Sequence, residues 1–370
     1  MEPTTYTDEV FYAEQAFDGT EMSWVNTILV GDAIERLREL PDECVNTVVT
    51  SPPYWGLRDY GVAGQIGLEA TPGEYVAKIV SVFREVRRVM RTDATLWLNL
   101  GDSYAGSGRG RNGDGTCHVD PNTKQATNRG SHAGVLQKRD MHDASVESGV
   151  IGRNWVSPPP GLKCKDLVGV PWRVAFALQA DGWWLRSDII WAKPNPMPES
   201  VTDRPTKAHE YIFLLSKSET YHYDGDAIRE RAIGDPGGNI VPTKGAGDPM
   251  MRTRNGLHLA QARAREAGGF EHRNRRTVWT VTTAQFPEAH FATFPETLVQ
   301  PCILAGSPAG GVVLDPFMGS GTTALVALKA ARRFVGVELN PQYAEMARKR
   351  IEPELTQLQL SPIPSLDQPK

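Results

Sequence analysis

Residues 311–323 read GVVLDPFMGSGTT, and the fold class can be inferred outward from their pattern. A valine-rich apolar run ends at Asp315, as a buried strand does, and Gly319 and Gly321 follow within six residues. Glycine lets the backbone turn sharply and lets a ligand approach without a Cβ in the way. Thr322 and Thr323 then open an apolar helical pattern. We therefore predict a strand, a glycine turn and a helix N-terminus.

An acid closes the next predicted strand. Glu338 stands 23 residues after Asp315, a distance suited to an acid that bonds the two hydroxyls of a ribose in nucleotide-binding crossovers. The three-glycine dinucleotide fingerprint and the lysine of a phosphate loop are both missing. This combination favours a nucleoside held without a pyrophosphate, which points to S-adenosylmethionine.

Strands and helices alternate along the rest of the chain. This alternation predicts an α/β fold with a doubly wound, mostly parallel sheet. The predicted strands are 27–30, 45–50, 95–100, 184–191, 211–215, 311–315 and 333–338. The predicted helices are 34–40, 75–91, 171–181, 294–305, 322–331 and 341–351.

Two irregular stretches interrupt this pattern, and they define the predicted segments. We expect an N-terminal extension (1–26), a catalytic half (27–103), an irregular, disorder-prone insertion (104–160), a continuation of the same domain (161–223), a small target-recognition region (224–276), a cofactor-binding half (277–352) and a flexible tail (353–370).

A second turn follows the strand 45–50 directly. Thr50 leads into Ser51-Pro52-Pro53-Tyr54-Trp55, and two consecutive prolines forbid continuing the strand. A strand that ends in a rigid turn with a hydroxyl and an aromatic ring is a candidate catalytic element. A purely structural turn, with the aromatic ring packed beneath it, is the alternative.

With both turns in view, the chain resembles the amino-group DNA methyltransferases. Their catalytic motif is Ser, Asn or Asp followed by Pro-Pro and an aromatic residue, and their cofactor motif is close to residues 315–323. The catalytic motif precedes the cofactor motif, as in the circularly permuted β group. Agreement extends to Gly31-Asp32, to 191–195 (WAKPN), to 209–211 (HEY) and to 292–296 (ATFPE), so the resemblance covers roughly residues 27–351.

The resemblance implies a Rossmann-like fold, S-adenosylmethionine as cofactor, double-stranded DNA as partner and a set of site residues. The implied catalytic residues are Ser51, Pro52, Pro53 and Tyr54. The implied cofactor-binding residues are Asp32, Phe294, Pro295, Asp315, Pro316, Phe317, Gly319, Gly321, Thr322, Thr323 and Glu338. Two of them have structural alternatives, since Asp32 can cap a helix and Phe294 can anchor one in the core.

The chemistry of an aromatic amine explains the catalytic motif. The lone pair of an exocyclic amine is delocalised into the ring, so the nitrogen is a poor nucleophile. The Ser51 hydroxyl and the Pro52 carbonyl can accept hydrogen bonds from the two N–H groups of the amine and draw its nitrogen toward a tetrahedral shape. Tyr54 can stack on a base that has left the duplex, because the amine cannot meet the cofactor inside the stack.

Several alternatives remain at this stage. Ser51 favours cytosine N4 over adenine N6, although the two amines pose nearly the same chemical problem. Cytosine C5 would need a cysteine nucleophile, and Cys302 instead lies in a predicted core helix. A non-catalytic DNA-binding protein would show a broken motif, and a protein-glutamine methyltransferase would show Asn in place of Ser51.

Charge is unevenly distributed along the chain. The net charge is −4, yet ten Lys/Arg stand against five acids between Arg229 and Arg276. Such a segment can meet phosphates and base edges, and a solvated loop is the alternative. The candidate DNA contacts are Arg273, Arg275 and Arg276.

Other features limit the remaining functions. Four cysteines without paired spacing disfavour a zinc site or a disulfide framework, and no step requires a metal. No run reaches the roughly 18 apolar residues of a membrane span, and the N-terminus does not resemble a secretory signal, so we expect a cytoplasmic protein. A cognate restriction endonuclease is an expected partner, and the sequence leaves open whether the protein is a monomer or a homodimer.

Overall fold

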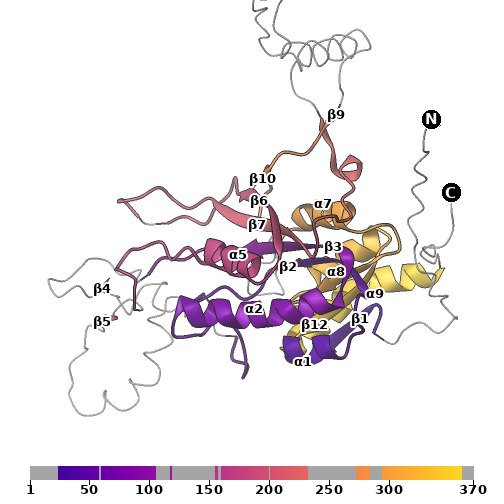
Figure 1. Cartoon of the computed structure of the whole chain (residues 1–370), viewed down its shortest axis with the longest axis horizontal. Coiled ribbons are helices and arrows are strands. Elements are labelled where there is room, and N and C mark those ends of the chain that lie inside the picture. The colour runs from indigo at the N-terminus through magenta and orange to yellow at the C-terminus, as the bar shows by residue number, and fades with distance from the viewer. Residues whose placement is uncertain are drawn as a thin grey trace, which may run out of the picture.

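The computed structural model describes residues 24–57, 60–105, 117–118, 155–156, 160–199, 201–231, 272–283 and 294–360. An eight-stranded sheet forms its centre (Figure 1). In sheet order the strands are β1 (Thr27–Val30), β12 (Arg333–Glu338), β11 (Val312–Asp315), β2 (Val45–Thr50), β3 (Met90–Leu100), β7 (His209–Ser216), β6 (Trp184–Ala192) and β10 (Val278–Thr280).

The sheet is mostly parallel, as predicted. Strand β7 runs antiparallel to both of its neighbours, and the other adjacent pairs are parallel. The C-terminal strand β11 lies beside the N-terminal strand β2, in register at Leu314 and Val48. The order of the strands therefore reverses between them, and ligands of doubly wound sheets bind at such a point, beyond the carboxyl ends of the strands.

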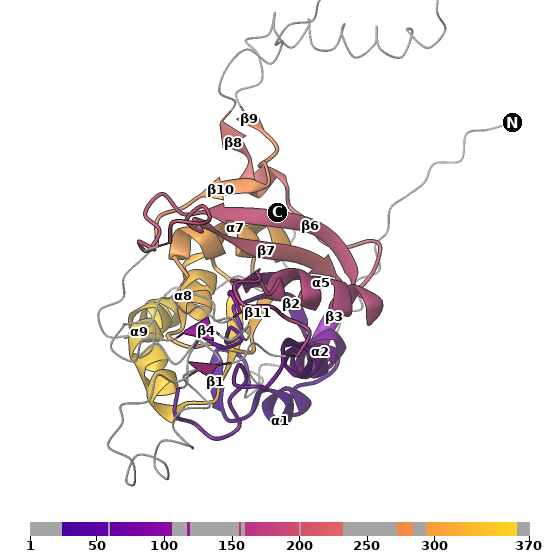
Figure 2. The ribbon, with the colours of Figure 1, turned by 90° about the vertical axis from the view of Figure 1, so that its left-hand side faces the viewer.

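Helices cover both faces of the sheet, which makes three layers (Figure 2). One face packs α1 (Ala33–Arg38), α2 (Pro72–Val89) and α5 (Val170–Ala180), and the other packs α7 (Glu296–Gly306), α8 (Thr322–Lys329) and α9 (Pro341–Leu360). Each layer contacts the sheet through its own apolar cluster, with Phe83 central to the first and Phe334 to the second. Burying a side chain of this size contributes about 1.5 to 3 kcal/mol.

The start of α2 shows how the sequence fixes a helix locally. Thr71 accepts a hydrogen bond from Glu74 N at 3.2 Å, and the Glu74 side chain accepts one from Thr71 N at 3.1 Å. This capping box satisfies two backbone donors, and Pro72 in the first turn has no donor to satisfy.

Some elements differ from the sequence prediction. Helix α9 was expected to end at Ile351 but continues to Leu360 through Pro353, because Ile351 and Leu355 both pack on the core one turn apart. The edge strand β10 and five short elements were not predicted. These are the paired strands β4 (Cys117–His118) and β5 (Trp155–Val156), the 3₁₀ turn η1 (Asp226–Ile228), and the paired strands β8 (Glu230–Arg231) and β9 (His272–Arg273). Elements of two or three residues carry too little periodicity to be recognised.

Most of the predicted insertion at 104–160 and of the predicted region at 224–276, the first 23 residues, and residues 361–370 lie outside the described residues. In the described part, no helix is long and apolar enough to span a membrane. Cys44 and Cys302 are free thiols, but Cys164 is disulfide-bonded, so the argument from cysteine spacing against disulfide bonds is wrong at that residue.

Candidate active site

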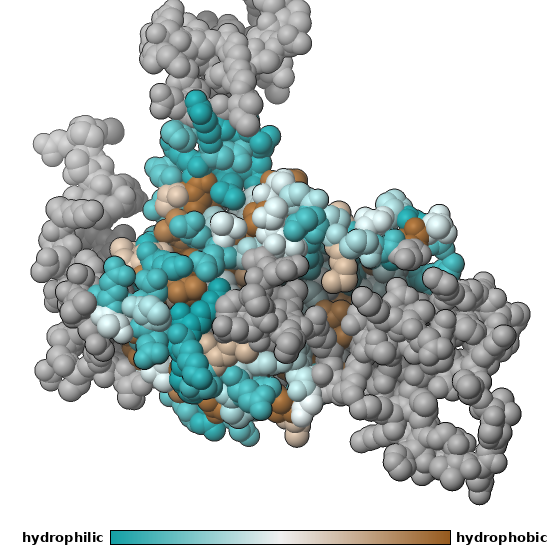
Figure 3. Space-filling model, turned by 180° about the vertical axis from the view of Figure 1, so that it is seen from behind, coloured by the Kyte–Doolittle hydropathy of each residue, from teal (hydrophilic) through white to brown (hydrophobic). Residues whose placement is uncertain are grey.

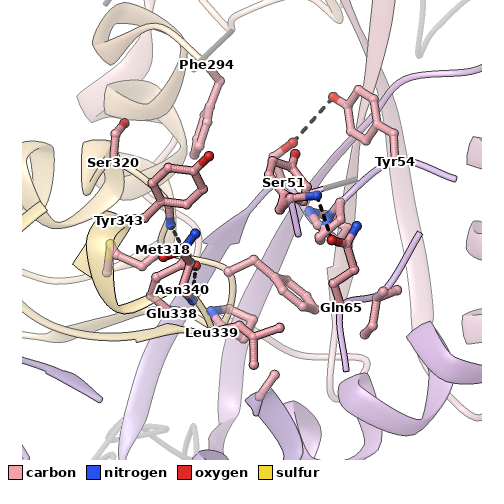
Figure 4. A pocket seen from close by; sticks show the side chains of 18 of the residues that line it. Ser51, Tyr54, Gln65, Phe294, Met318, Ser320, Glu338, Leu339, Asn340 and Tyr343 are labelled. Atoms are coloured by element: carbon pink, nitrogen blue, oxygen red, sulfur yellow. Dashed lines mark hydrogen bonds between the residues drawn. The ribbon is translucent and has the colours of Figure 1, made fainter. Parts of the chain in front are cut away.

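A cavity of about 260 Å³ opens at the carboxyl ends of β1, β12, β11 and β2. Figure 4 shows its two sides, with Glu338, Asn340 and Tyr343 on one and Ser51 and Tyr54 on the other. Residues from both halves of the chain line it, including Asp32, Ser51, Pro52, Pro53, Tyr54, Asn99, Trp191, Lys193, Glu210, Phe294, Pro316, Phe317, Met318, Gly319, Ser320, Thr322, Glu338, Asn340 and Tyr343. The strand reversal thus brings the two predicted turns into one site.

Asp315 holds the glycine turn in place from beneath. Its fully buried carboxylate accepts hydrogen bonds from Thr50 Oγ1 at 2.7 Å, from Thr323 Oγ1 at 2.7 Å and from Phe317 N at 3.0 Å. Burial raises the pKa of Asp315 to about 6, and the hydrogen bonds oppose that rise. Because Thr50 ends β2, Asp315 joins the glycine turn to the strand that leads into the Ser51 to Tyr54 turn.

Glu338 presents its carboxylate to the cavity with both oxygens fixed. Oε2 accepts from Gly319 N at 2.7 Å, and Oε1 accepts from Asn340 N at 2.8 Å. Burial raises the pKa of Glu338, while these two backbone bonds lower it. A carboxylate oxygen has two lone pairs, so each oxygen keeps one for a ligand hydroxyl.

The glycine turn needs its glycines. Gly319 and Gly321 have φ of 53° and 79°, in the left-handed region that favours glycine. A Cβ at Gly321 would also stand 2.9 Å from Ala347 Cβ of α9. The turn therefore brings backbone to the cavity at Gly319 and lets α8 pack closely on α9 at Gly321.

Asp32 has a structural role that the sequence had offered as an alternative. Its Oδ1 accepts from Ile34 N at 2.9 Å and Glu35 N at 3.2 Å and so caps α1, yet the residue also lines the cavity. Phe294 lines the opposite wall just before α7, and its ring borders the space in front of Ser51 (Figure 4).

The predicted catalytic motif, Ser51 to Tyr54, is fixed at Pro53 and at its aromatic ring. Tyr75 of α2 donates to Pro53 O at 3.0 Å, and both prolines line the cavity. A Cβ at Gly101 would collide with Tyr54 Cε2 and stand 2.9 Å from Cδ2. The ring of Tyr54 thus lies directly on the backbone that leaves β3.

A polar network surrounds the hydroxyl of Tyr54. Tyr54 Oη donates to Glu210 Oε2 at 2.7 Å and lies 3.2 Å from Asn99 Oδ1, and Ser51 Oγ donates to Tyr54 Oη at 3.4 Å. Lys193 forms an ion pair with Glu210 Oε1 and lies over the Trp191 ring, 4.2 Å from its centroid. Burial and the Glu210 charge raise the pKa of Tyr54, so the phenol stays protonated.

Of the cofactor residues implied by sequence, seven line the cavity and four do not. Asp315 and Thr323 are buried beneath the turn, Pro295 caps α7, and Gly321 begins α8. None of these four is on the cavity wall, so their contribution is to the shape of the site.

The candidate DNA contacts lie apart from the cavity, at the stem formed by β8 and β9, whose surface is hydrophilic (Figure 3). Arg273 and Arg276 both bond Glu230 Oε1, at 2.8 and 2.6 Å, and Arg275 lies over the Trp279 ring, 4.5 Å from its centroid. The Arg276 side chain is 66% exposed and the Arg273 side chain 34% exposed, so Arg276 is the more accessible of the two to a DNA backbone.

Sequence reasoning did not assign several residues of the cavity. Asn99 lies near the end of β3, Lys193 directly follows β6 and Glu210 lies at the start of β7, and Lys193 and Glu210 belong to stretches that showed the family resemblance. Polar residues at the ends of predicted strands were the sequence signal that could have indicated their place in the site. Cys302, in contrast, is buried in α7 with a raised pKa and does not line the cavity, which disfavours it as a nucleophile.

Comparison with known proteins now adds to this geometry. A family model described as DNA methylase, of the N6/N4 type, matches residues 45–349. The chain belongs to this family. It is 44% identical over 330 residues to the type II methyltransferase M.Cfr9I of Citrobacter freundii, covering 89% of each chain. It is 46% identical over 327 residues to M.SmaI of Serratia marcescens, covering 88% of this chain and 90% of that one.

A solved structure shares the fold. The PvuII DNA methyltransferase, described as cytosine-N4-specific, superposes with a TM-score of 0.50 at 18% identity, covering 93% of this chain and 95% of that one. The predicted family and fold class are confirmed, and the protein is a DNA methyltransferase of the N4/N6 type. Its substrate is DNA and its cofactor is S-adenosylmethionine. Among the described residues, no cluster of three or more His, Cys, Asp or Glu side chains could hold a metal.

Proposed function

We propose that this DNA methyltransferase modifies the exocyclic N4 amine of cytosine after the base has left the duplex. The observation that carries the proposal is the single cavity in which Ser51 and Tyr54 face the glycine turn and Glu338. Bound S-adenosylmethionine supplies an electrophilic methyl group on a sulfonium. Methyl transfer to the amine would form the nitrogen–carbon bond as the sulfur–carbon bond breaks, leave the cofactor as a neutral thioether and release one amine proton to water.

The residues of the C-terminal half fit this cofactor. Glu338 offers two carboxylate oxygens, already oriented by backbone donors, to the ribose hydroxyls. Gly319 lets the backbone approach without a Cβ, and Phe294 supplies an apolar wall. Asp315, Pro295, Gly321 and Thr323 shape the turn from behind, and Asp32, Pro316, Phe317 and Thr322 complete the lining.

The residues of the N-terminal half fit the base. Tyr54 offers a ring for stacking, and Ser51 Oγ and Pro52 O offer acceptors for the two amine N–H bonds. Fixed acceptors of this kind accelerate transfer by orientation and by electrostatic stabilisation of the positive charge that develops on nitrogen.

Ser51 favours cytosine over adenine, because Ser at this position accompanies N4 enzymes in the family that the motif resembles. Adenine N6 is the second candidate, because Tyr54 can stack on either base and the acceptors suit either amine. The type II names of its relatives also support a role beside a cognate restriction endonuclease.

One experiment separates these candidates. The purified protein is incubated with unmethylated genomic DNA and S-adenosylmethionine, and the DNA is digested to nucleosides for mass spectrometry. We expect N4-methylcytosine. N6-methyladenine would overturn the base assignment, and the absence of any methylated nucleoside, with cofactor binding demonstrated, would overturn the proposed activity on this DNA.

We also propose that the stem of β8 and β9 contacts the DNA backbone. Reversing the charge of both Arg273 and Arg276 should weaken DNA binding and reduce the salt slope by about one to two, the number of phosphate contacts removed, without changing cofactor affinity. A titration at several salt concentrations measures this. An unchanged slope would contradict the proposal.

A further inference from the structure

Ser51 can serve as an acceptor for the amine only if its own proton points elsewhere. A serine hydroxyl has one proton and two lone pairs, and the proton rotates to whichever acceptor is nearest. A hydroxyl that donates to Tyr54 keeps both lone pairs for other donors. The direction of the hydrogen bond between Ser51 and Tyr54 therefore decides what Ser51 can do (Figure 4).

That direction is determined by groups that can only accept. Tyr54 Oη is 2.7 Å from Glu210 Oε2 and 3.2 Å from Asn99 Oδ1, and neither of these oxygens carries a proton when Glu210 is ionised. The single phenolic proton must go to one of them. Tyr54 Oη then has no proton left for Ser51 and can only accept from it.

Asn99 is itself fixed in the orientation that this requires. Its Nδ2 donates to Tyr211 O at 3.1 Å and to Glu210 Oε2 at 3.3 Å, so its Oδ1 faces Tyr54. A carbonyl oxygen cannot donate, so the Tyr211 contact assigns the amide nitrogen and oxygen without ambiguity.

Lys193 holds Glu210 as a hydrogen-bond acceptor. Its ammonium pairs with Oε1, and both side chains are only 17% exposed, so water screens the pair weakly. The ammonium also lies over the Trp191 ring, which holds it in place. Lys193 Nζ can only donate, so Glu210 Oε1 accepts from it, and Oε2 accepts from Asn99 Nδ2 at 3.3 Å.

We propose that Glu210, held by Lys193, is a positioning residue that sets the hydrogen-bond direction from Ser51 through Tyr54 and so makes Ser51 an acceptor for the target amine. This inference rests on the proposed role of Ser51. Neither Lys193 nor Glu210 touches the reacting atoms in this account, since Glu210 acts through Tyr54. An Asp at the position of Ser51 would be a charged acceptor by itself. With Ser51 at that position, the Glu210 carboxylate supplies the negative charge.

The test compares Tyr54→Phe, Glu210→Gln and the double variant. Single-turnover methyl transfer is measured at saturating S-adenosylmethionine and DNA, with the cofactor Kd and Tm of each protein. Glutamine can donate or accept, so it leaves the direction undefined. We expect each single variant to lose about 10- to 100-fold in transfer rate, with the cofactor Kd within about twofold of wild type.

The double variant gives the decisive readout. Because Glu210 acts through the Tyr54 hydroxyl, the double variant should be no more than about twofold slower than Tyr54→Phe. A general structural defect would instead make the two losses multiply. Glu85→Gln is the matched control, since Glu85 also pairs with a cationic side chain, that of Arg88, and is 22% exposed but lies on α2, away from the cavity.

Each other outcome overturns the inference. A Glu210→Gln rate within twofold of wild type would do so, as would losses that multiply. If Glu210→Gln leaves Lys193 unpaired and fails to fold, Lys193→Met combined with Glu210→Gln removes both charges and should show the same loss. Failure of the proposed function is distinguishable, because the wild-type protein would then form no N4-methylcytosine.

Discussion

The two sides of the cavity are built in different ways. The cofactor side comes from consecutive elements, β11, α8 and β12, and Gly319 and Glu338 bond one another across 19 residues of sequence. The base side draws one residue from each of several elements, and Tyr54 and Glu210 bond across 156 residues. The cofactor side is therefore a local motif, whereas the base side exists only once β3, β6 and β7 are aligned.

This difference predicts that the two sides fail separately. Ser51→Ala and Tyr54→Ala should each lose at least about 100-fold in methyl transfer, since an acceptor or the stacking ring is gone. Cofactor affinity should stay within about twofold of wild type. Calorimetric titration and a filter-binding transfer assay measure the two quantities, and near-normal turnover in either variant would remove the proposed mechanism.

A glycine tests how closely the base side must fit. In Gly101→Ala the new Cβ collides with the Tyr54 ring, so we expect the transfer rate to fall about 10- to 100-fold through misplacement of that ring. The cofactor Kd should not change. Gly73→Ala is the control, because its Cβ would stand 3.8 Å from Thr71 Oγ1, an ordinary contact. Equal behaviour of the two variants would contradict this prediction.

The cofactor side is tested by Glu338→Gln. The amide nitrogen cannot accept from Gly319 N or Asn340 N, so one buried donor loses its partner and the ligand loses an acceptor. We expect about tenfold weaker cofactor binding and a near-normal transfer rate at saturating cofactor. Glu345→Gln on α9, which is 56% exposed, should match wild type. A lowered rate at saturation would place Glu338 in the chemistry instead.

Asp315 links the two sides of the cavity through Thr50 and Thr323, and we expect its substitution to have the smallest effect, on the pH dependence of stability. The pKa of Asp315 is about 6 in the folded protein against an ordinary value of 3.8, so the folded state holds this proton to higher pH. That group therefore contributes stability below about pH 4 that is lost as pH rises through 6.

Asp315→Asn does not titrate and should remove this dependence. The free energy of unfolding of wild type relative to the variant should fall by on the order of 2 kcal/mol between pH 4 and 7. Urea titrations at several pH values measure it. Parallel pH profiles for the two proteins would show that Asp315 keeps an ordinary pKa.

How much the sequence predicts follows the same division. The glycine turn, Glu338 and the Ser51 to Tyr54 turn were found because each lies in a short stretch whose spacing has a physical meaning. Glu210 was noticed in the 209–211 stretch but received no role, because its partner Tyr54 is far away in sequence. Helix α9 was cut short at Ile351 because a proline normally ends a helix, and packing by Leu355 overrides that local rule.

The most direct measurement is a crystal structure of the protein with S-adenosylhomocysteine, the cofactor after loss of its methyl group, and a DNA duplex that carries the methylation site. We predict a cytosine outside the duplex, stacked on Tyr54, with its N4 atom within hydrogen-bond distance of Ser51 Oγ and with Glu338 on the ribose of the cofactor. A base that stays stacked in the duplex, or an amine that faces away from Ser51, would contradict the account.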